Sequence, residues 1–147
     1  MKFLVSLTLL TVTLQFSSGC SSGSGAAASS VAASEGSLQT GLDAYEKGDY
    51  AAAETALAAA VTSGALQADL IETALRTLAQ SRIQLGKLDE AAADLEKLKA
   101  GAAELDKYWL TVAELEKKKG NASAVSDAIK QAKTLNPKVQ IPPALLK

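Results

Sequence analysis

The sequence predicts an all-α fold, built as a short solenoid of about three helix–turn–helix units. Gly86 and Gly120 lie 34 residues apart, and each follows one apolar helical stretch and precedes another. Gly48 has the same surroundings, with four extra residues in the interval. A fixed period of this length is typical of stacked helix pairs, which bury their apolar faces against their neighbours. Hydrophobic residues make up 48% of the chain but aromatic residues only 4%, so we expect an alanine-rich interior that lets helices approach closely.

The composition excludes several classes of function. The chain has no histidine and one cysteine, so it lacks both the usual general base near neutral pH and a His/Cys metal cage. Acid pairs such as Glu114 and Glu116 do not face each other on a helix, and no glycine-rich phosphate loop occurs. The net charge of −1 is unlike that of a nucleic-acid-binding domain. We therefore expect no enzyme, no catalytic residue, no cofactor, no metal, no nucleic-acid partner and no small-molecule substrate.

Residues 1–19 have the build of an export signal. Lys2 precedes an apolar stretch, Phe3–Phe16, and small residues follow it. The stretch is too short, and too interrupted by Thr, Ser and Gln, for a membrane span of roughly 18–20 apolar residues. A buried core helix is disfavoured because the stretch has no polar face.

The only cysteine stands at the end of this signal. Ser17-Ser18-Gly19-Cys20 resembles the bacterial lipobox, in which small residues precede a cysteine that becomes lipidated and N-terminal; Ser17 stands where Leu is usual. The resemblance implies a palmitate-bearing lipoprotein anchored at Cys20, and the following Ser21 implies the outer membrane, facing the periplasm. Two or more acyl chains give stable anchoring where one does not. The alternative is a signal cleaved within 26–30, which would release a secreted or periplasmic protein.

Residues 20–36 are expected to carry the lipidated cysteine and a flexible tether. The part after Cys20 is small, polar and nearly uncharged, so it lacks the side chains needed for a core. Sixteen such residues would have a root-mean-square reach of roughly 20–24 Å. Such a tether would keep the folded part near the membrane.

The predicted repeat domain spans residues 37–137, and glycines mark its turns. In the first unit a helix ends at Gly48, Asp49 caps the next helix, and that helix ends at 62–64. The second unit, about 67–99, carries a broad apolar stripe up to Gly86. Its return helix begins at Asp89 or in the turn before it, and we expect Asp94 on its solvated edge.

The third unit runs from about 102 to 137. It turns at Gly120-Asn121 and stops at Asn136-Pro137, because proline cannot continue a helix and disfavours helix in the residue before it. The tail, 138–147, contains Ile141, Leu145 and Leu146. These side chains either fold back over the last helix pair as a cap or belong to a disordered end.

The turns and several helix positions resemble the tetratricopeptide repeat (TPR) family. The segment 44–50, AYEKGDY, is similar to the turn between the two helices of that family, and 86–91, GKLDEA, is a second version. In the third copy, Trp109 matches the large aromatic that opens the first helix, Ala132 the small residue of the second helix, and Pro137 the closing proline. The resemblance covers about 37–137. The first copy departs from the pattern at Ser37, where an aromatic is common.

The resemblance implies a partner-binding groove lined by the first helices of successive units. The outward positions that match it, and that we expect to contact a partner, are Tyr45, Arg76, Gln80, Ile83, Glu114 and Lys117. This surface lacks the Lys/Asn/Arg arrangement with which family members clamp the terminal carboxylate of a peptide. The alternative is that Arg76 and Lys117 are ordinary solvated charges.

Two hypotheses of function follow from these observations. The first is a membrane-tethered adaptor of a bacterial cell-envelope assembly, which binds a peptide or helix of a protein partner in the groove. The second is a structural module that self-associates through its helical ends and has no peptide ligand. The sequence does not identify the partner.

The anchor is tested by the substitution Cys20→Ala. If the lipobox resemblance is correct, the variant loses the acylated residue and should no longer be retained by membranes, because stable anchoring needs the acyl chains. Fractionation of cells into membrane and soluble parts measures this. An unchanged distribution of Cys20→Ala would favour the freely secreted alternative.

Overall fold

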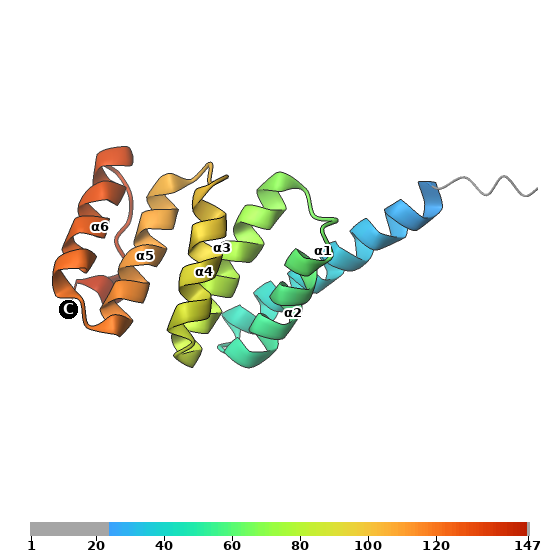
Figure 1. Ribbon diagram of the computed structural model, residues 1–147, viewed down its shortest axis with the longest axis horizontal. Coiled ribbons are helices and arrows are strands. Elements are labelled where there is room, and N and C mark those ends of the chain that lie inside the picture. The colour runs from blue at the N-terminus through green and yellow to red at the C-terminus, as the bar shows by residue number, and fades with distance from the viewer. Residues whose placement is uncertain (1–23, 147) are drawn as a thin grey trace, which may run out of the picture.

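The computed structural model describes residues 24–146, which form six α-helices and one short 3₁₀-helix and contain no strand (Figure 1). The predicted all-α class is confirmed. The predicted signal 1–19 and Cys20 lie outside the described residues. In chain order the elements are α1 (Ser24–Glu46), α2 (Tyr50–Thr62), α3 (Ala68–Leu85), α4 (Leu88–Lys99), α5 (Leu105–Lys119), α6 (Ala122–Leu135) and η1 (Pro143–Leu145).

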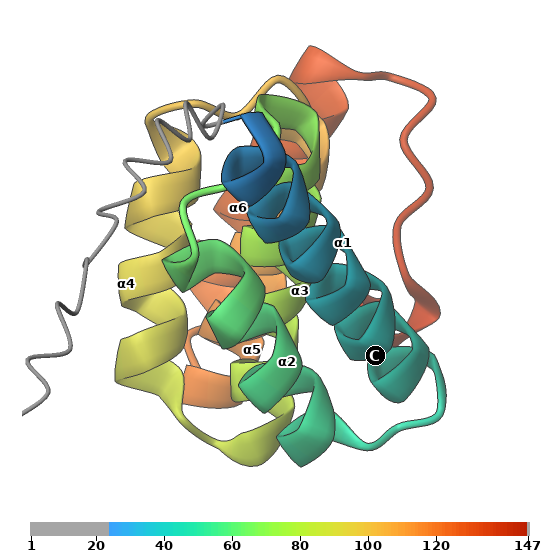
Figure 2. The same cartoon turned by 90° about the vertical axis from the view of Figure 1, so that its right-hand side faces the viewer.

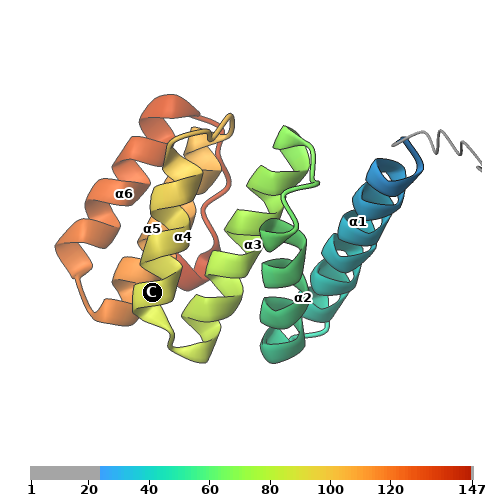
Figure 3. The same cartoon turned by 45° about the vertical axis from the view of Figure 1, so that its right-hand side comes forward.

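The six helices form three pairs that stack in layers along the long axis of the molecule (Figures 1 and 3). Within the pairs, α1 contacts α2, α3 contacts α4 and α5 contacts α6; between pairs, α2 contacts α3 and α4 contacts α5. The first helices also contact one another, α1 with α3 and α3 with α5. The arrangement is therefore that of a helical repeat. None of the helices between residues 24 and 146 has the length and apolarity that a membrane span requires.

The turns inside the pairs lie where the glycines predict them. Gly48, Gly86 and Gly120 have φ angles of 77°, 77° and 81°, in the left-handed region that closes a helix C-terminus. Asp49 caps α2, because its carboxylate accepts a hydrogen bond from the backbone N–H of Ala52 at 3.1 Å. The stops after α2 and α6 are also confirmed, since these helices end one residue before Ser63 and Asn136.

The predicted flexible tether is wrong over 24–36, because these residues are the first half of helix α1. Alanine has the highest helix propensity, and 24–36 contains five alanines. The helix also has a tertiary contact here, since the Ser34 hydroxyl is buried and donates to Ser63 Oγ at 2.7 Å. The helical body therefore begins at Ser24, ahead of the predicted boundary at residue 37.

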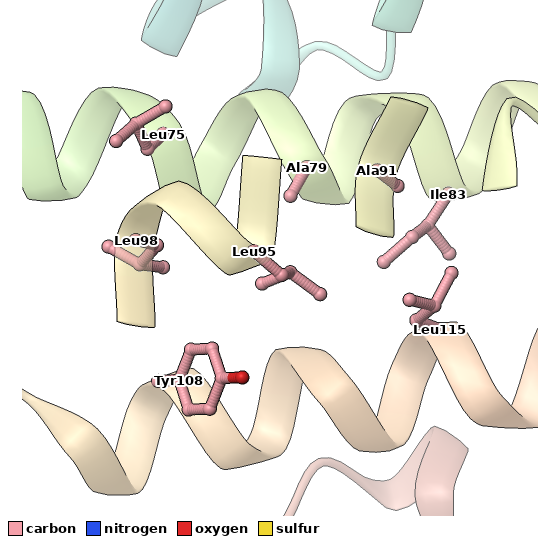
Figure 4. Close-up of a cluster of buried hydrophobic side chains, with 8 residues drawn as sticks. All are labelled: Leu75, Ala79, Ile83, Ala91, Leu95, Leu98, Tyr108 and Leu115. Carbon is pink, nitrogen blue, oxygen red and sulfur yellow. The ribbon is translucent and has the colours of Figure 1, made fainter. Parts of the chain in front are cut away.

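Three clusters of buried side chains form the core, one beside each pair. The central cluster joins α3 and α4 to α5, and Figure 4 shows its side chains meeting between the three helices. Fully burying a leucine or isoleucine side chain contributes about 1.5–3 kcal/mol. The members of this cluster are Leu75, Ala79, Ile83, Ala91, Leu95, Leu98, Tyr108 and Leu115.

One polar contact recurs in all three pairs, between the first helix and the chain after the second helix. Ser34 bonds Ser63 at 2.7 Å, and Asp106 accepts from Asn136 Nδ2 at 2.8 Å. Glu72 accepts from the backbone N–H of the residues at 103 and 104, at 2.9 and 3.0 Å. The three first-helix positions are separated by 38 and 34 residues, as are the turn glycines. The recurrence places α1 in the same register as α3 and α5.

The C-terminal tail is ordered and caps the third pair. After α6 the chain returns along α5, on the right in Figure 2. Leu145 is buried against Ala113 and Ala128, and Ile141 packs on the same cluster. Leu146 stays 66% exposed. Of the two alternatives for the tail, the structure therefore shows the cap.

A small, buried residue recurs at one position of the first helix in each pair. Gly41, Ala79 and Ala113 occupy this position in the three pairs and are all buried. A Cβ atom added to Gly41 would lie 2.5 Å from Leu57 Cγ and 3.1 Å from Leu57 N. The backbone atom cannot move aside as a side chain can, so glycine is required here.

We expect Gly41→Ala to destabilise the protein by about 1–3 kcal/mol, because overpacking outweighs the gain in helix propensity. Gly36→Ala is the matched control, since Gly36 lies in the same helix and a Cβ there meets nothing within 4 Å. That control should stabilise by about 0.5–1 kcal/mol. Urea unfolding followed by circular dichroism measures both. A Gly41→Ala protein as stable as Gly36→Ala would contradict the proposed close approach.

Candidate functional site

Three of the six predicted groove residues meet on one face of the molecule. Tyr45 lies on α1, Gln80 on α3 and Glu114 on α5, so each first helix contributes one side chain. Gln80 Nε2 donates to Glu114 Oε2 at 3.2 Å, and the Glu114 carboxylate raises the pKa of the Tyr45 phenol. Tyr45 also packs edge-to-face on Tyr50, with ring centroids 5.6 Å apart. We call Tyr45, Gln80 and Glu114 the polar cluster.

Burial sets the electrostatics of the polar cluster. Burial, followed by the charges of Glu114 and Tyr50, raises the pKa of Tyr45 to about 12. Burial also raises the pKa of the Glu114 carboxyl, and the hydrogen bond from Gln80 opposes this only in part. No ion pair within residues 24–146 involves Glu114. An ionised carboxylate that is partly buried without a cation costs stability.

The Arg76 side chain forms ion pairs within the protein. Its guanidinium lies 3.0 Å from the Glu104 carboxylate and 3.6 Å from that of Glu72, and its side chain is 15% exposed. Glu72 in turn accepts the two backbone N–H groups that precede α5. Arg76 therefore makes a structural contact that fixes the start of α5 on α3, and its contact with a partner stays a prediction.

Ile83 is not a groove residue, and this prediction is wrong. Its side chain is fully buried in the central cluster, where it points toward Leu115 (Figure 4). The same repeat position holds Tyr45 in the first pair and Lys117 in the third. In the second pair this position faces α5 of the following unit, so an aliphatic residue is buried there.

Lys117 is held by the C-terminal tail. Its Nζ donates a hydrogen bond to the carbonyl oxygen of Ala144, next to η1. Lys117 thus marks the point at which the tail meets α5, three residues after Glu114 on that helix. Of the six predicted residues, the structure brings together Tyr45, Gln80 and Glu114, buries Ile83, and gives Arg76 and Lys117 contacts within the chain.

Asp94 was predicted on a solvated edge, and this is also wrong. It is 1% exposed and accepts from Arg82 Nη1 at 2.6 Å, while Arg82 Nε donates to Glu54 at 3.1 Å. The three residues join α2, α3 and α4. The spacing in the sequence indicates this burial. Asp94 lies three residues after Ala91 and four before Leu98, and so shares their face of the helix.

Clefts on the described surface include one in the third pair and one between the second and third pairs. The larger, about 480 Å³, lies between α5, α6 and the tail, and the smaller, about 380 Å³, lies between the start of α3 and the chain before α5. No group of three or more acidic or thiol side chains in residues 24–146 is arranged to hold a metal ion. The larger cleft is lined by Lys117, Gly120, Ala122, Val125, Ser126, Ile129, Leu145 and Leu146.

Comparison with known proteins gives no match, since no family model, no curated protein and no solved structure matches this chain. The all-α repeat arrangement therefore stands on the helices and their contacts.

The raised pKa of Glu114 gives a pH-dependent prediction. The pKa of Glu114 in the folded state lies above its ordinary value of 4.5. The free-energy cost of burying the ionised carboxylate is therefore absent below pH 4.5, grows as Glu114 ionises, and is complete above the folded-state pKa. Glu114→Gln should therefore be more stable than the parent chain near pH 7. The two should be equally stable near pH 3.5, where Glu114 is protonated in both states. Urea unfolding at both pH values measures the difference.

The matched control is Glu96→Gln, which removes an exposed acid on α4. It should change stability by less than about 0.5 kcal/mol at either pH. If Glu114→Gln is less stable than the parent near pH 7, Glu114 is not the destabilising group described above.

Proposed function

We propose that this chain is an adaptor without catalytic activity, which binds a protein partner at the polar cluster and is tethered to a bacterial envelope membrane through a lipid on Cys20. The observation that carries the proposal is the environment of the Glu114 carboxylate. This carboxylate is partly buried, lacks a cation within the described chain, and so costs stability. Groups kept at such a cost are characteristic of functional sites.

The chemistry of the polar cluster indicates what the partner offers. Glu114 can accept a charge-assisted hydrogen bond from a lysine, an arginine or a backbone N–H of the partner. The half-buried ring of Tyr45 lies near that carboxylate and can pack over a cation. We therefore propose that the partner segment is a basic peptide or helix that crosses the first helices.

The repeat architecture supports the proposal by placing three side chains from three helices on one rigid surface. Because the first helices contact one another, a segment lying across them touches α1, α3 and α5 at once. The lipid anchor rests on the lipobox resemblance. Only Ser21, Ser22 and Gly23 lie between Cys20 and the first residue of α1.

Self-association through the helical ends is less well supported. The positions of α1 that correspond to the buried Ala74 and Leu78 of α3 are Gly36 and Thr40, and both are exposed. An end-to-end stack needs apolar side chains at these positions, and α1 offers none. The outer face of α1 is that of a terminal unit that meets water.

The adaptor proposal is tested with a photo-crosslinking phenylalanine analogue in place of Tyr45, in the full chain expressed in its own envelope. The analogue should capture one protein, and Glu114→Lys should reduce that capture at least about tenfold, because it replaces an acceptor with a like charge. Immunoblotting against the tagged chain measures the yield. The captured segment, identified by mass spectrometry, should be basic.

Glu96→Lys is the matched control, since it introduces the same charge change at an exposed position of α4, outside the polar cluster. It should leave capture unchanged. Equal capture by the Glu114→Lys and Glu96→Lys proteins would remove the polar cluster from the binding site.

A further inference from the structure

On the third pair, the tail packs where the first helix of the following unit packs on the other two pairs. In the first two pairs, the exposed end of the core is covered by the next first helix, which inserts Ala74 and Leu78 from α3 and Val112 from α5. In the third pair, Ile141 and Leu145 pack on the equivalent surface of α5 and α6. They are four residues apart, as Ala74 and Leu78 are.

The tail covers this surface only in part. Pro142 and Pro143 prevent a full helix, and the tail forms only the three-residue η1. The cleft of about 480 Å³ remains beside it, lined on its apolar side by Val125 and Ile129 of α6. Leu146, on the rim of the cleft, is 66% exposed. This side of the third pair therefore offers space for apolar side chains from outside residues 24–146.

The side chains that line this cleft come from the basic part of the chain. Residues 117–146 contain six lysines and one aspartate, whereas residues 24–116 contain fifteen acidic and seven basic side chains. Lys130 lies one helical turn after Ser126 of the cleft, and Lys133 one turn after Ile129. Both are exposed, and neither forms an ion pair within residues 24–146.

We propose that the cleft between α5, α6 and the tail is a second docking site, which binds an acidic amphipathic helix of a partner protein. The apolar face of that helix contacts Val125, Ile129 and Leu146, and its acids lie beside Lys130 and Lys133. The proposal goes beyond the adaptor function, because it concerns a surface other than the polar cluster and a partner segment of opposite charge.

Two other occupants fit the cleft less well. A second copy of the chain would offer α1, whose outer positions Gly36 and Thr40 carry no apolar side chain for the cleft. An anionic membrane needs apolar side chains that protrude from the surface, whereas Val125 and Ile129 line a concavity. A helix with bulky side chains on one face matches both the hollow and the surrounding lysines.

The proposal is tested by fluorescence anisotropy with three labelled peptides and the full chain. The first is an 18-residue helix with leucines on one face and glutamates elsewhere, the second has lysines in place of the glutamates, and the third is the first with its leucines scattered. The glutamate helix should bind at least about tenfold more tightly than either of the others, because it alone matches both charge and apolar face. Equal binding of the three peptides would overturn the proposal.

Matched variants locate the site. The double variant Lys130→Glu and Lys133→Glu should weaken binding of the glutamate helix about tenfold. The same change at the exposed Lys47 and Lys99 should have little effect. Leu146→Ser should weaken binding at least about threefold, whereas Leu135→Ser, at an exposed leucine outside the cleft, should not.

Two results would overturn the proposal at this stage. One is a cleft variant that binds the glutamate helix as tightly as its control variant does. The other is a protein that ignores the glutamate helix but binds phosphatidylglycerol vesicles in a way that Leu146→Ser abolishes, which would assign the cleft to a lipid surface. Glu114→Lys, at the polar cluster, should leave binding of the glutamate helix unchanged, so the two proposals fail separately.

Discussion

Every pair in this protein depends on a small residue that faces a large aliphatic one where two helices cross. Gly41 faces Leu57, and the corresponding positions hold Ala79 with Leu95 and Ala113 with Ile129. The small residue lets the helix backbones approach, and the aliphatic residue fills the remaining space to the density of a protein interior. The first helix of the following pair packs on this one. A change in the distance between the two helices of one pair would therefore also displace the neighbouring pair.

Polar contacts fix how neighbouring pairs sit on this apolar framework. Arg82 reaches from α3 to Asp94 on α4 and Glu54 on α2, and so joins the first pair to both helices of the second. Removing one member of such a partly buried network leaves a charge unpaired, which costs far more than an exposed ion pair contributes. Glu72 and Arg76 do the same between α3 and the start of α5. Apolar packing stacks the units, and these charges select one orientation.

The turns could be predicted from the sequence because each is a local event. Gly48, Gly86 and Gly120 close their helices through their own left-handed backbone conformation, which depends on no distant residue. The tether, the burial of Asp94 and the position of Ile83 depend on distant residues. The small, polar segment 24–36 folds as a helix through alanine propensity and through a bond to Ser63, and Ile83 is buried because Leu115 of the next unit covers it. Of the candidate site, the sequence could therefore predict the helix positions, but not which side chains the protein uses internally.

Charge is distributed unevenly along the helical stack, so the two proposed surfaces differ in charge. The polar cluster belongs to the acidic part of the chain, and the cleft is lined by side chains from residues 117–146, where lysines outnumber acids six to one. A rigid stack keeps the two surfaces at a fixed distance, because each unit contacts only its neighbours and cannot fold back on itself. Two partner segments of opposite charge would then be sorted between the surfaces by repulsion as well as by attraction. Such an adaptor sets the order and spacing of its partners without moving.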